Sequence, residues 1–202
     1  MTIYLAKKIT EFFIQCQVIK ETDRDTYEYC FQVFLMNIIN FGTIMLLGLV
    51  FKCIIETILF VIGFTVIRKQ AGGYHSSTPF RCYLLSVANY IIFVSLLSLI
   101  PSSWANLMSL LIISLACIII WLYAPVADKN KPFSIGEYER YKRNSRLIIS
   151  ILFVFNLCAF FIKIISIQVH MLSFDLGILF AAVSLFTSKL INKDTPSYNN
   201  LS

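Results

Sequence analysis

The longest apolar block of this chain covers residues 30–67, a run of 38 residues in which Lys52 and Glu56 are the charged side chains. A helix crosses the hydrocarbon core of a bilayer with about 20 mainly apolar residues, so the block is nearly two crossings long. Gly48 and Lys52 mark the predicted hairpin between these two crossings.

Four further apolar blocks bring the prediction to six membrane-spanning helices: 83–100, 107–123, 147–167 and about 174–190. Residues 101–103 and 168–173 are predicted to be short connections, which makes the helices on either side antiparallel neighbours. Only 14% of the residues are charged, against roughly a quarter in soluble domains. Segments of alternating polarity, as in a membrane β-barrel, are absent from the sequence. We therefore predict an all-α, polytopic integral membrane protein with one membrane-embedded domain over residues 1–202.

The basic residues predict the orientation, because cytosolic loops are enriched in Lys and Arg. With both termini in the cytosol, 15 of the 17 basic residues fall on the cytosolic side, and Lys52 and Lys163 lie near the outer face. The opposite orientation would place those 15 outside. The cytosolic segments then include a loop at 68–82 and a basic loop at 124–146.

Residues 1–29 are predicted to form an amphipathic segment at the cytosolic face, with a helix over about 3–19. Such a helix either lies in the headgroup plane or packs on the protein's own cytosolic face. Glu11 and Gln15 interrupt its apolar residues, so a cleavable signal peptide is not expected. The six cysteines contain no C-x-x-C pair and no metal-ligand spacing, so neither a disulfide scaffold nor a metal site is predicted.

The loop R-K-Q-A-G-G-Y-H-S-S-T-P-F-R-C, residues 68–82, concentrates polar chemistry in an otherwise apolar chain. Thr78 before Pro79 is typical of a helix N-cap followed by proline at the first helical position. Cys82 then lies in the first turn of the third span, where the helix N-terminus and Arg81 favour the thiolate. His75 lies on a loop that can fold back over Cys82, so a Cys–His dyad is geometrically possible.

Simpler interpretations of the same residues stay open. A histidine beside a membrane helix is commonly an interfacial side chain, and a cysteine in a span is commonly a small packing residue. Arg68 and Lys69 are by default cytosolic anchors of the second span. His75 and Cys82 alone do not make a metal site, because zinc needs at least three protein ligands.

Two stretches resemble a known family. The pattern R-K-x-x-G-G-x-H-x-x-x-x-x-x-C, from Arg68 to Cys82, is similar to the signature of the accessory gene regulator B (AgrB) family of membrane cysteine peptidases. Residues 123–132, Y-A-P-V-A-D-K-N-K-P, resemble a segment that follows a later span in that family. Chain length, span pattern and basic loops also match, so the resemblance covers essentially the whole chain.

The resemblance implies a membrane cysteine endopeptidase of bacterial quorum sensing, with its active site on the cytosolic side of the plasma membrane. Its substrate would be a small AgrD-like precursor peptide, whose C-terminal tail is removed and whose core is closed as a thiolactone or lactone. Cys82 matches the nucleophile and His75 the general base, and no residue is assigned as a third catalytic member. Glu56 is expected near the outer face, and Asp128 lies in another loop. The residues expected to support the motif or bind substrate are Arg68, Lys69, Gly72, Gly73 and Arg81.

The expected partners are the precursor peptide and the lipid bilayer, with no cofactor and no nucleic acid. A homodimer is allowed by the resemblance and by small residues such as Ala181 and Ala182. Family precursors end in an acidic tail, which could dock on the basic residues of 68–82 or of 137–146. Ser134 and Glu137 form a predicted capping box at the start of that second segment. The alternative is that these basic residues mainly determine topology and attract anionic lipid.

Two other classes of function compete with a peptidase. A small peptide transporter fits six spans, but Glu56, Lys163 and Asp175 are all expected near the outer side rather than at the midplane, where transport sites usually lie. Three asparagines in the spans, at 37, 40 and 89, serve equally well in helix packing. A non-enzymatic membrane scaffold is the second competitor.

Overall fold

The computed structural model describes residues 2–73, 78–126, 135–162 and 165–191, and within these ranges the chain is helical and contains no β-strand. This confirms the all-α prediction. The helices are α1 (Thr2–Gln15), η1 (Glu21–Asp23), α2 (Arg24–Val50), α3 (Ile54–Ala71), α4 (Pro79–Leu99), α5 (Ser102–Tyr123), α6 (Ile135–Ile162) and α7 (Ile165–Ile191).

Five helices of the described chain are long and apolar enough to cross a membrane: α2, α4, α5, α6 and α7. The remaining predicted crossing, the second along the chain, is α3. It has 18 residues, which span about 27 Å at 1.5 Å per residue. Its first turn contains Glu56 and its last turn contains Arg68 and Lys69. The membrane-helical character is therefore established, whereas six crossings and cytosolic termini stay predictions.

The predicted hairpin between the first two crossings is confirmed. α2 ends at Val50 and α3 begins at Ile54, and Lys52 adopts the left-handed region with φ 57°. The Cys53 amide donates to the Gly48 carbonyl at 2.9 Å. A Cβ on Gly48 would lie 2.6 Å from Thr57 Oγ1, so glycine lets the two helices approach closely beside the turn.

The predicted connection at 168–173 is wrong, because these residues lie within α7. The fifth predicted span, 147–167, likewise ends earlier, since α6 stops at Ile162 and α7 begins at Ile165. This part of α7 contains polar side chains, which the helix accommodates. The Ser173 hydroxyl donates to the Val169 carbonyl one turn back, and His170 Nδ1 lies 3.3 Å from Glu56 Oε1 of α3.

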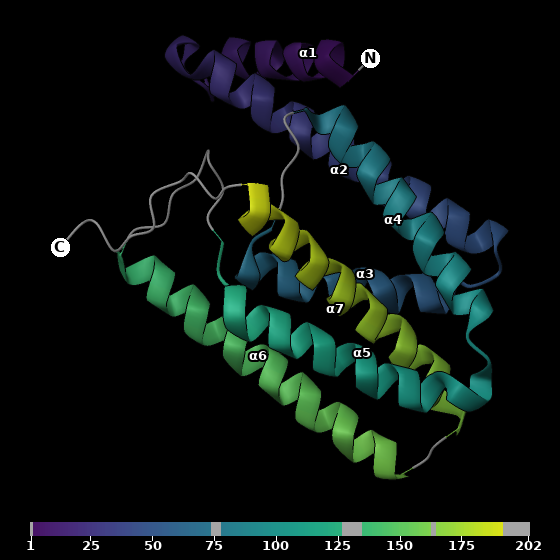
Figure 1. Cartoon of the computed structure of the whole chain (residues 1–202). Helices are drawn as coiled ribbons and strands as arrows, with labels where there is room; N and C mark the ends of the chain where they lie inside the picture. Colours follow the sequence, from purple (N-terminus) through teal and green to yellow (C-terminus); the bar gives the residue numbers. More distant parts are fainter. Residues whose placement is uncertain (1, 74–77, 127–134, 163–164, 192–202) are drawn as a thin grey trace.

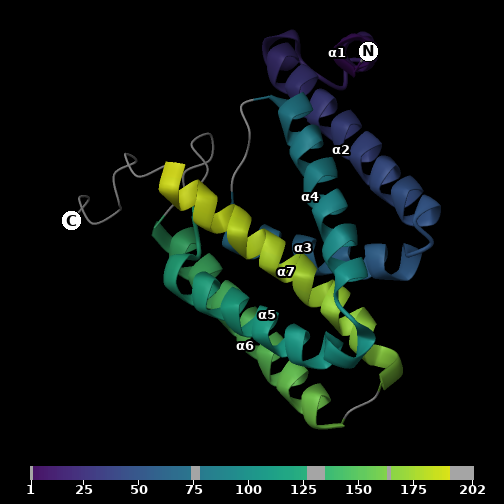
Figure 2. The same ribbon diagram turned by 45° about the vertical axis from the view of Figure 1, so that its right-hand side comes forward.

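The helices form two groups (Figures 1 and 2). α3, α5, α6 and α7 make one bundle, in which α7 packs against both α3 and α5. α2 and α4 pack on each other beside this bundle, and α4 has few contacts with α7. α1 lies across the start of α2, at the end of the molecule where α4 also begins.

α3 and α7 approach so closely that backbone meets backbone. A Cβ on Gly63 of α3 would lie 2.3 Å from the Phe174 carbonyl oxygen of α7. In return, a Cβ on Gly177 of α7 would lie 2.2 Å from the Phe60 carbonyl oxygen of α3. Small residues at helix contacts permit this kind of packing in membranes, where dispersion forces rather than water exclusion hold helices together.

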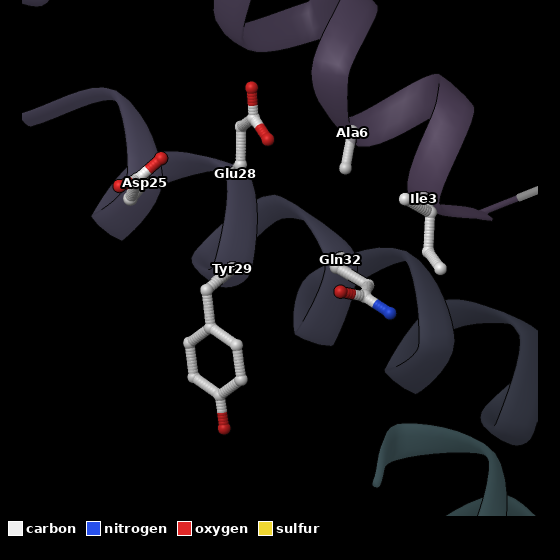
Figure 3. A pocket seen from close by; sticks show the side chains of 6 residues that line it. All are labelled: Ile3, Ala6, Asp25, Glu28, Tyr29 and Gln32. Carbon is white, nitrogen blue, oxygen red and sulfur yellow. The ribbon is translucent and has the colours of Figure 1, made fainter.

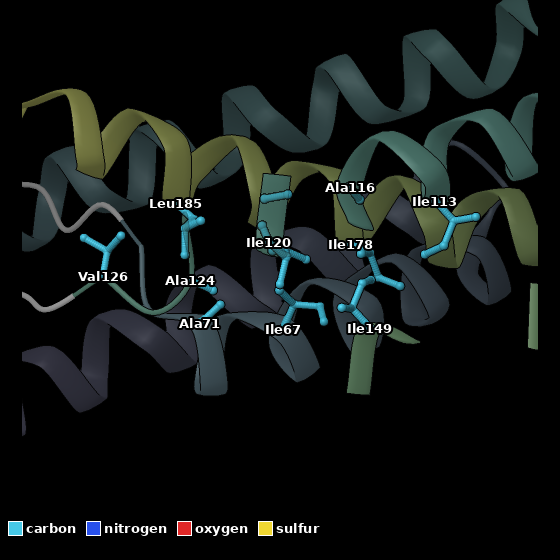
Figure 4. Packing of buried hydrophobic residues seen from close by; sticks show 12 residues of the cluster. Ile67, Ala71, Ile113, Ala116, Ile120, Ala124, Val126, Ile149, Ile178 and Leu185 are labelled. Atoms are coloured by element: carbon cyan, nitrogen blue, oxygen red, sulfur yellow. The ribbon is translucent and has the colours of Figure 1, made fainter. Parts of the chain in front are cut away.

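The bundle encloses the larger cluster of buried side chains, built around Ile67, Ile113, Ile120 and Ile178 (Figure 4). Ala181 and Ala182 belong to this cluster and have no exposed surface. The small-residue face that the sequence offered for self-association is therefore used inside the chain. A homodimer cannot be built on these two alanines.

A second cluster joins α2 and α4 to the bundle. The rings of Phe60 and Phe93 stack with their centroids 4.2 Å apart. Next to them, the buried hydroxyls of Thr57 and Tyr90 are hydrogen-bonded at 2.7 Å, so the polar group of Tyr90 has a partner inside the apolar layer.

The N-terminal helix is amphipathic, as predicted, and buries Ala6 and Thr10 against the rest of the chain while Ile3, Leu5 and Phe12 are exposed. It therefore both packs on α2 and presents apolar side chains outward. The Arg24 guanidinium ties the two helices together by donating to Glu11 at 2.8 Å and to Glu21 at 2.6 Å. Between α1 and α2 lies a cavity of about 200 Å³, with Asp25, Glu28, Tyr29 and Gln32 of α2 along one side (Figure 3).

Candidate active site

The end of α3 carries the first part of the R-K-x-x-G-G motif in a specific backbone conformation. Gly72 has φ 77° and Gly73 has φ 143°, both in the region that side chains with a Cβ rarely adopt. Arg68 lies one turn earlier, half-buried, and its Nη1 donates to Ser184 Oγ of α7. Lys69 is exposed at the same helix end.

The space that Gly73 leaves empty is filled by the arginine. A Cβ on Gly73 would lie 2.1 Å from Arg68 Nη1 and 3.2 Å from Ser184 Oγ. The motif spacing therefore has a physical cause. A guanidinium reaching from α3 to α7 passes directly over the backbone five residues later, and a side chain at that position would displace it.

The two stretches that sequence analysis singled out meet in space. The Val126 amide donates to the Ala71 carbonyl at 3.0 Å, and Gly72 and Val126 form an isolated parallel bridge. A Cβ on Gly72 would lie 2.3 Å from the Val126 carbonyl oxygen. Thus the A-P-V segment that follows α5 is held against Ala71 and Gly72, at the end of α3.

Cys82 lies in the first turn of α4, as predicted. Thr78 is the N-cap with extended backbone, its side chain accepts from the Arg81 amide at 3.4 Å, and Pro79 occupies the first helical position. The Cys82 amide donates to the Thr78 carbonyl at 3.2 Å. The Cys82 side chain is half-buried, and Arg81 is exposed. The thiol therefore lies in the first helical turn, at the end of α4 where the positive end of the helix dipole lies.

The predicted site residues fall into two separate groups. Arg68, Gly72 and Gly73 lie together where α3 ends beside α7. Cys82 lies at the start of α4, which is beside α2 in both views of the ribbon (Figures 1 and 2). His75 lies between the two groups in sequence, within residues 74–77, outside the described residues, so its distance from Cys82 stays a prediction.

Residues 137–146 form the first turns of α6, as expected for a segment that continues into a span. Ser134 of the predicted capping box lies outside the described residues, as does Asp128. Arg146 is committed to packing: it donates to the Trp121 carbonyl at 3.1 Å, and its guanidinium lies 4.9 Å from the centre of the Trp121 ring. Arg140 and Arg143 are exposed.

Sequence reasoning missed a buried polar cluster and the partner of Arg68. The Asp175 carboxylate accepts from the Ser109 hydroxyl and the Asn156 amide, which joins α7, α5 and α6 inside the bundle. Asp175 had been expected only as one of a few ionisable residues near the outer side. Ser184, 116 residues from Arg68, resembles any serine in a span. In the sequence, the sole signal for the Asp175 cluster or for Ser184 was a polar residue within an apolar span.

Within the described ranges, no group of three or more His, Cys, Asp or Glu side chains lies close enough to hold a metal ion. All six cysteines are free thiols.

Comparison with known proteins identifies the family of this chain. The accessory gene regulator B family model matches residues 6–193, which is nearly the whole chain. The chain belongs to the accessory gene regulator B family.

Two of three similar proteins carry the accessory gene regulator B name. Accessory gene regulator protein B of Staphylococcus aureus (strain MRSA252) is 27% identical over 187 residues, covering 90% of this chain and 94% of the relative. An AgrB-like protein of Clostridium perfringens (strain SM101) is 25% identical over 197 residues, covering 88% of each chain. Protein FsrB of Enterococcus faecalis is 26% identical over 136 residues, covering 67% of this chain and 55% of FsrB. No solved structure matches this chain.

The family membership confirms the resemblance first drawn from the motifs at 68–82 and 123–132. It places the chain among the accessory gene regulator proteins of quorum-sensing systems. The structure adds that these two motifs contact each other through Ala71, Gly72 and Val126.

Proposed function

We propose that this AgrB-family protein is a membrane cysteine endopeptidase that removes the C-terminal tail of a small precursor peptide and promotes its cyclisation. The observation that carries the proposal is the position of Cys82, half-buried in the first turn of α4 behind a Thr-Pro cap. A helix N-terminus is where proteins activate thiols, because amide groups and the helix dipole favour negative charge there.

The first half of the reaction forms an acyl-enzyme. The His75 imidazole accepts the Cys82 proton, and the thiolate attacks the carbonyl carbon of the scissile peptide bond. The C–N bond then breaks, and the imidazolium gives its proton to the departing amine. The tail leaves, and the remaining peptide is held on Cys82 as a thioester.

The second half transfers the acyl group within the peptide. An internal cysteine or serine of the precursor gives its proton to His75 and attacks the thioester carbonyl, which closes the ring, breaks the bond to Cys82 and releases the Cys82 thiolate. Exchange of one thioester for another is nearly isoenergetic, so the acyl-enzyme keeps the free energy that hydrolysis would dissipate. Water therefore has to be excluded while the thioester exists, and the apolar side chains of Phe80, Leu84 and Leu85 in the first turns of α4 suit this requirement.

The acidic tail of the precursor would be drawn to basic residues at the same membrane face. Lys69, Arg81, Arg140 and Arg143 are candidates for this role because their side chains are exposed or at helix ends. Arg146 is a weaker candidate, because it already binds the Trp121 carbonyl and ring. We place this face on the cytosolic side of the bacterial plasma membrane.

Two alanine substitutions test the proposal. Cys82→Ala and, separately, His75→Ala are expected to abolish tail release from a precursor carrying a C-terminal epitope, with membrane insertion unchanged. The chain supplies matched controls: Cys158→Ala removes an exposed cysteine of α6, and His170→Ala removes the second histidine. Both controls should release the tail. Undiminished release by either Cys82→Ala or His75→Ala would leave a transporter or a scaffold as the better account.

A further inference from the structure

Ser184 makes a contact that its surroundings in the sequence do not suggest. It lies in α7 with its hydroxyl accepting from Arg68 Nη1 of α3, at the helix end where the R-K-x-x-G-G motif finishes. Arg68 also lies over the Phe64 ring, with 5.9 Å between the guanidinium carbon and the ring centre. The guanidinium is thus directed along α3 toward α7, rather than outward like Lys69, which is exposed.

Gly73 completes a three-part contact with these two side chains. A Cβ at Gly73 would be 2.1 Å from Arg68 Nη1 and 3.2 Å from Ser184 Oγ. The backbone of Gly73 is buried at this point. The hydrogen-bonded pair therefore lies against the last described residue before the segment that contains His75.

A second contact holds the same backbone from the other side. The Ala71 carbonyl accepts from the Val126 amide, and the Gly72 backbone lies so close to Val126 that a Cβ would be 2.3 Å from its carbonyl oxygen. The backbone at 71–73 therefore packs between the Arg68–Ser184 pair at α7 and the segment that follows α5. Of these contacts, the hydrogen bond between Arg68 and Ser184 is the one that a side-chain substitution can remove.

We propose that Ser184 is a positioning residue for the catalytic dyad: by holding Arg68 against Gly73, it determines where and in which direction the loop bearing His75 leaves α3. The proposal rests on the function proposed above. It assigns to Arg68 a role in positioning the loop, whereas binding of the acidic tail is left to the exposed basic residues.

Matched substitutions at Ser184 isolate the hydroxyl. Ser184→Thr keeps the hydroxyl and adds a methyl group, and Ser184→Val has nearly the same shape as threonine without the hydroxyl. We expect Ser184→Val to lower kcat for tail release on the order of tenfold to a hundredfold with little change in KM, as for a misplaced catalytic group. Ser184→Thr should stay close to the wild-type protein.

Two further measurements make the role specific. In a chain whose other five cysteines are replaced by alanine, Ser184→Val should alter the pH profile of Cys82 alkylation by iodoacetamide, and Ser184→Thr should not. In a double-mutant cycle, Arg68→Ala should remove the effect of Ser184→Val, because the hydroxyl then has no guanidinium to hold.

Each alternative outcome is decisive. Equal activity of the Val and Thr variants and the wild-type protein would overturn the proposal, and so would equal losses in both variants, which would show that shape rather than the hydroxyl matters. A rise in KM with unchanged kcat would make Arg68 a substrate-binding residue instead. These failures differ from failure of the proposed function, in which Cys82→Ala itself would still release the tail.

Discussion

Replacing Gly177 by alanine tests the packing on which the whole bundle depends. The added methyl carbon would lie 2.2 Å from the Phe60 carbonyl oxygen and 2.9 Å from the Phe64 amide nitrogen, both of which are backbone atoms of α3. Backbone atoms in a helix cannot turn aside as a flexible side chain can. To restore an ordinary contact of 3.4 Å, α3 and α7 would have to separate locally by about 1.2 Å.

The cost can be estimated from this separation. Overpacking a close-packed site typically costs about 1–3 kcal/mol, and a gap of about 1 Å forfeits up to half of the dispersion energy of the atoms that line it. The helical preference of alanine over glycine returns about 0.5–1 kcal/mol. We therefore expect Gly177→Ala to lower the free energy of unfolding by about 2 kcal/mol, roughly a thirtyfold change in the unfolding equilibrium.

The assay is reversible unfolding of the purified protein in mixed micelles, titrated with sodium dodecyl sulfate and followed by circular dichroism. Gly42→Ala in α2 is the matched control, because nothing lies within 4 Å of its added Cβ. This control should be neutral or slightly stabilised. Gly63→Ala should resemble Gly177→Ala, and the double variant should cost less than the sum, since both methyl groups open the same gap. A Gly177→Ala protein as stable as Gly42→Ala would refute the close approach of α3 and α7.

Substitutions at three further positions give separate tests. Asp175→Ala removes the acceptor that Ser109 and Asn156 share and leaves them only their longer contacts with each other, at 3.3 and 3.5 Å. It should cost about 1–3 kcal/mol, while Asp175→Asn, which keeps an acceptor, should be milder in the same unfolding assay. Gly72→Ala forces a Cβ into the left-handed region and against the Val126 carbonyl, so tail release should be lost, and normal release would contradict the contact between the two motifs. Thr78→Val removes the cap oxygen and should cost about 0.5–2 kcal/mol. Hydrogen exchange in the first turn around Cys82 should rise accordingly, and unchanged exchange would show that the cap is not needed.

Much of the helical layout could be predicted from local sequence alone. Long apolar blocks predict spanning helices, Lys52 marked the turn between α2 and α3, and Thr78-Pro79 predicted the start of α4. These features depend on neighbouring residues, which is why periodicity, turn chemistry and capping rules capture them. The error at the start of α7 has the same origin. His170 lies in the segment predicted as a connection, and its partner, Glu56, is far away in sequence.

The candidate site shows the same difference between local features and contacts with distant segments. Motif positions such as Gly72 and Gly73 could be singled out from the sequence, but the reason for glycine there could not. That reason lies in Val126, from the segment after α5, and in Arg68, which Ser184 of α7 holds over Gly73. Contacts between distant segments are set by the packing of the whole bundle, and a single span of small and apolar residues around Ser184 carries no record of them.

The most direct test of the account is to isolate the peptide bound to Cys82. The wild-type protein mixed with a precursor whose ring-forming cysteine or serine is replaced by alanine should accumulate an acyl-enzyme, because the second transfer has no nucleophile. Intact-protein mass spectrometry should show the mass of the tail-less peptide, on Cys82 by peptide mapping and released by neutral hydroxylamine as expected of a thioester. Tail release that proceeds with no adduct on Cys82, or with the adduct on another cysteine, would contradict the account.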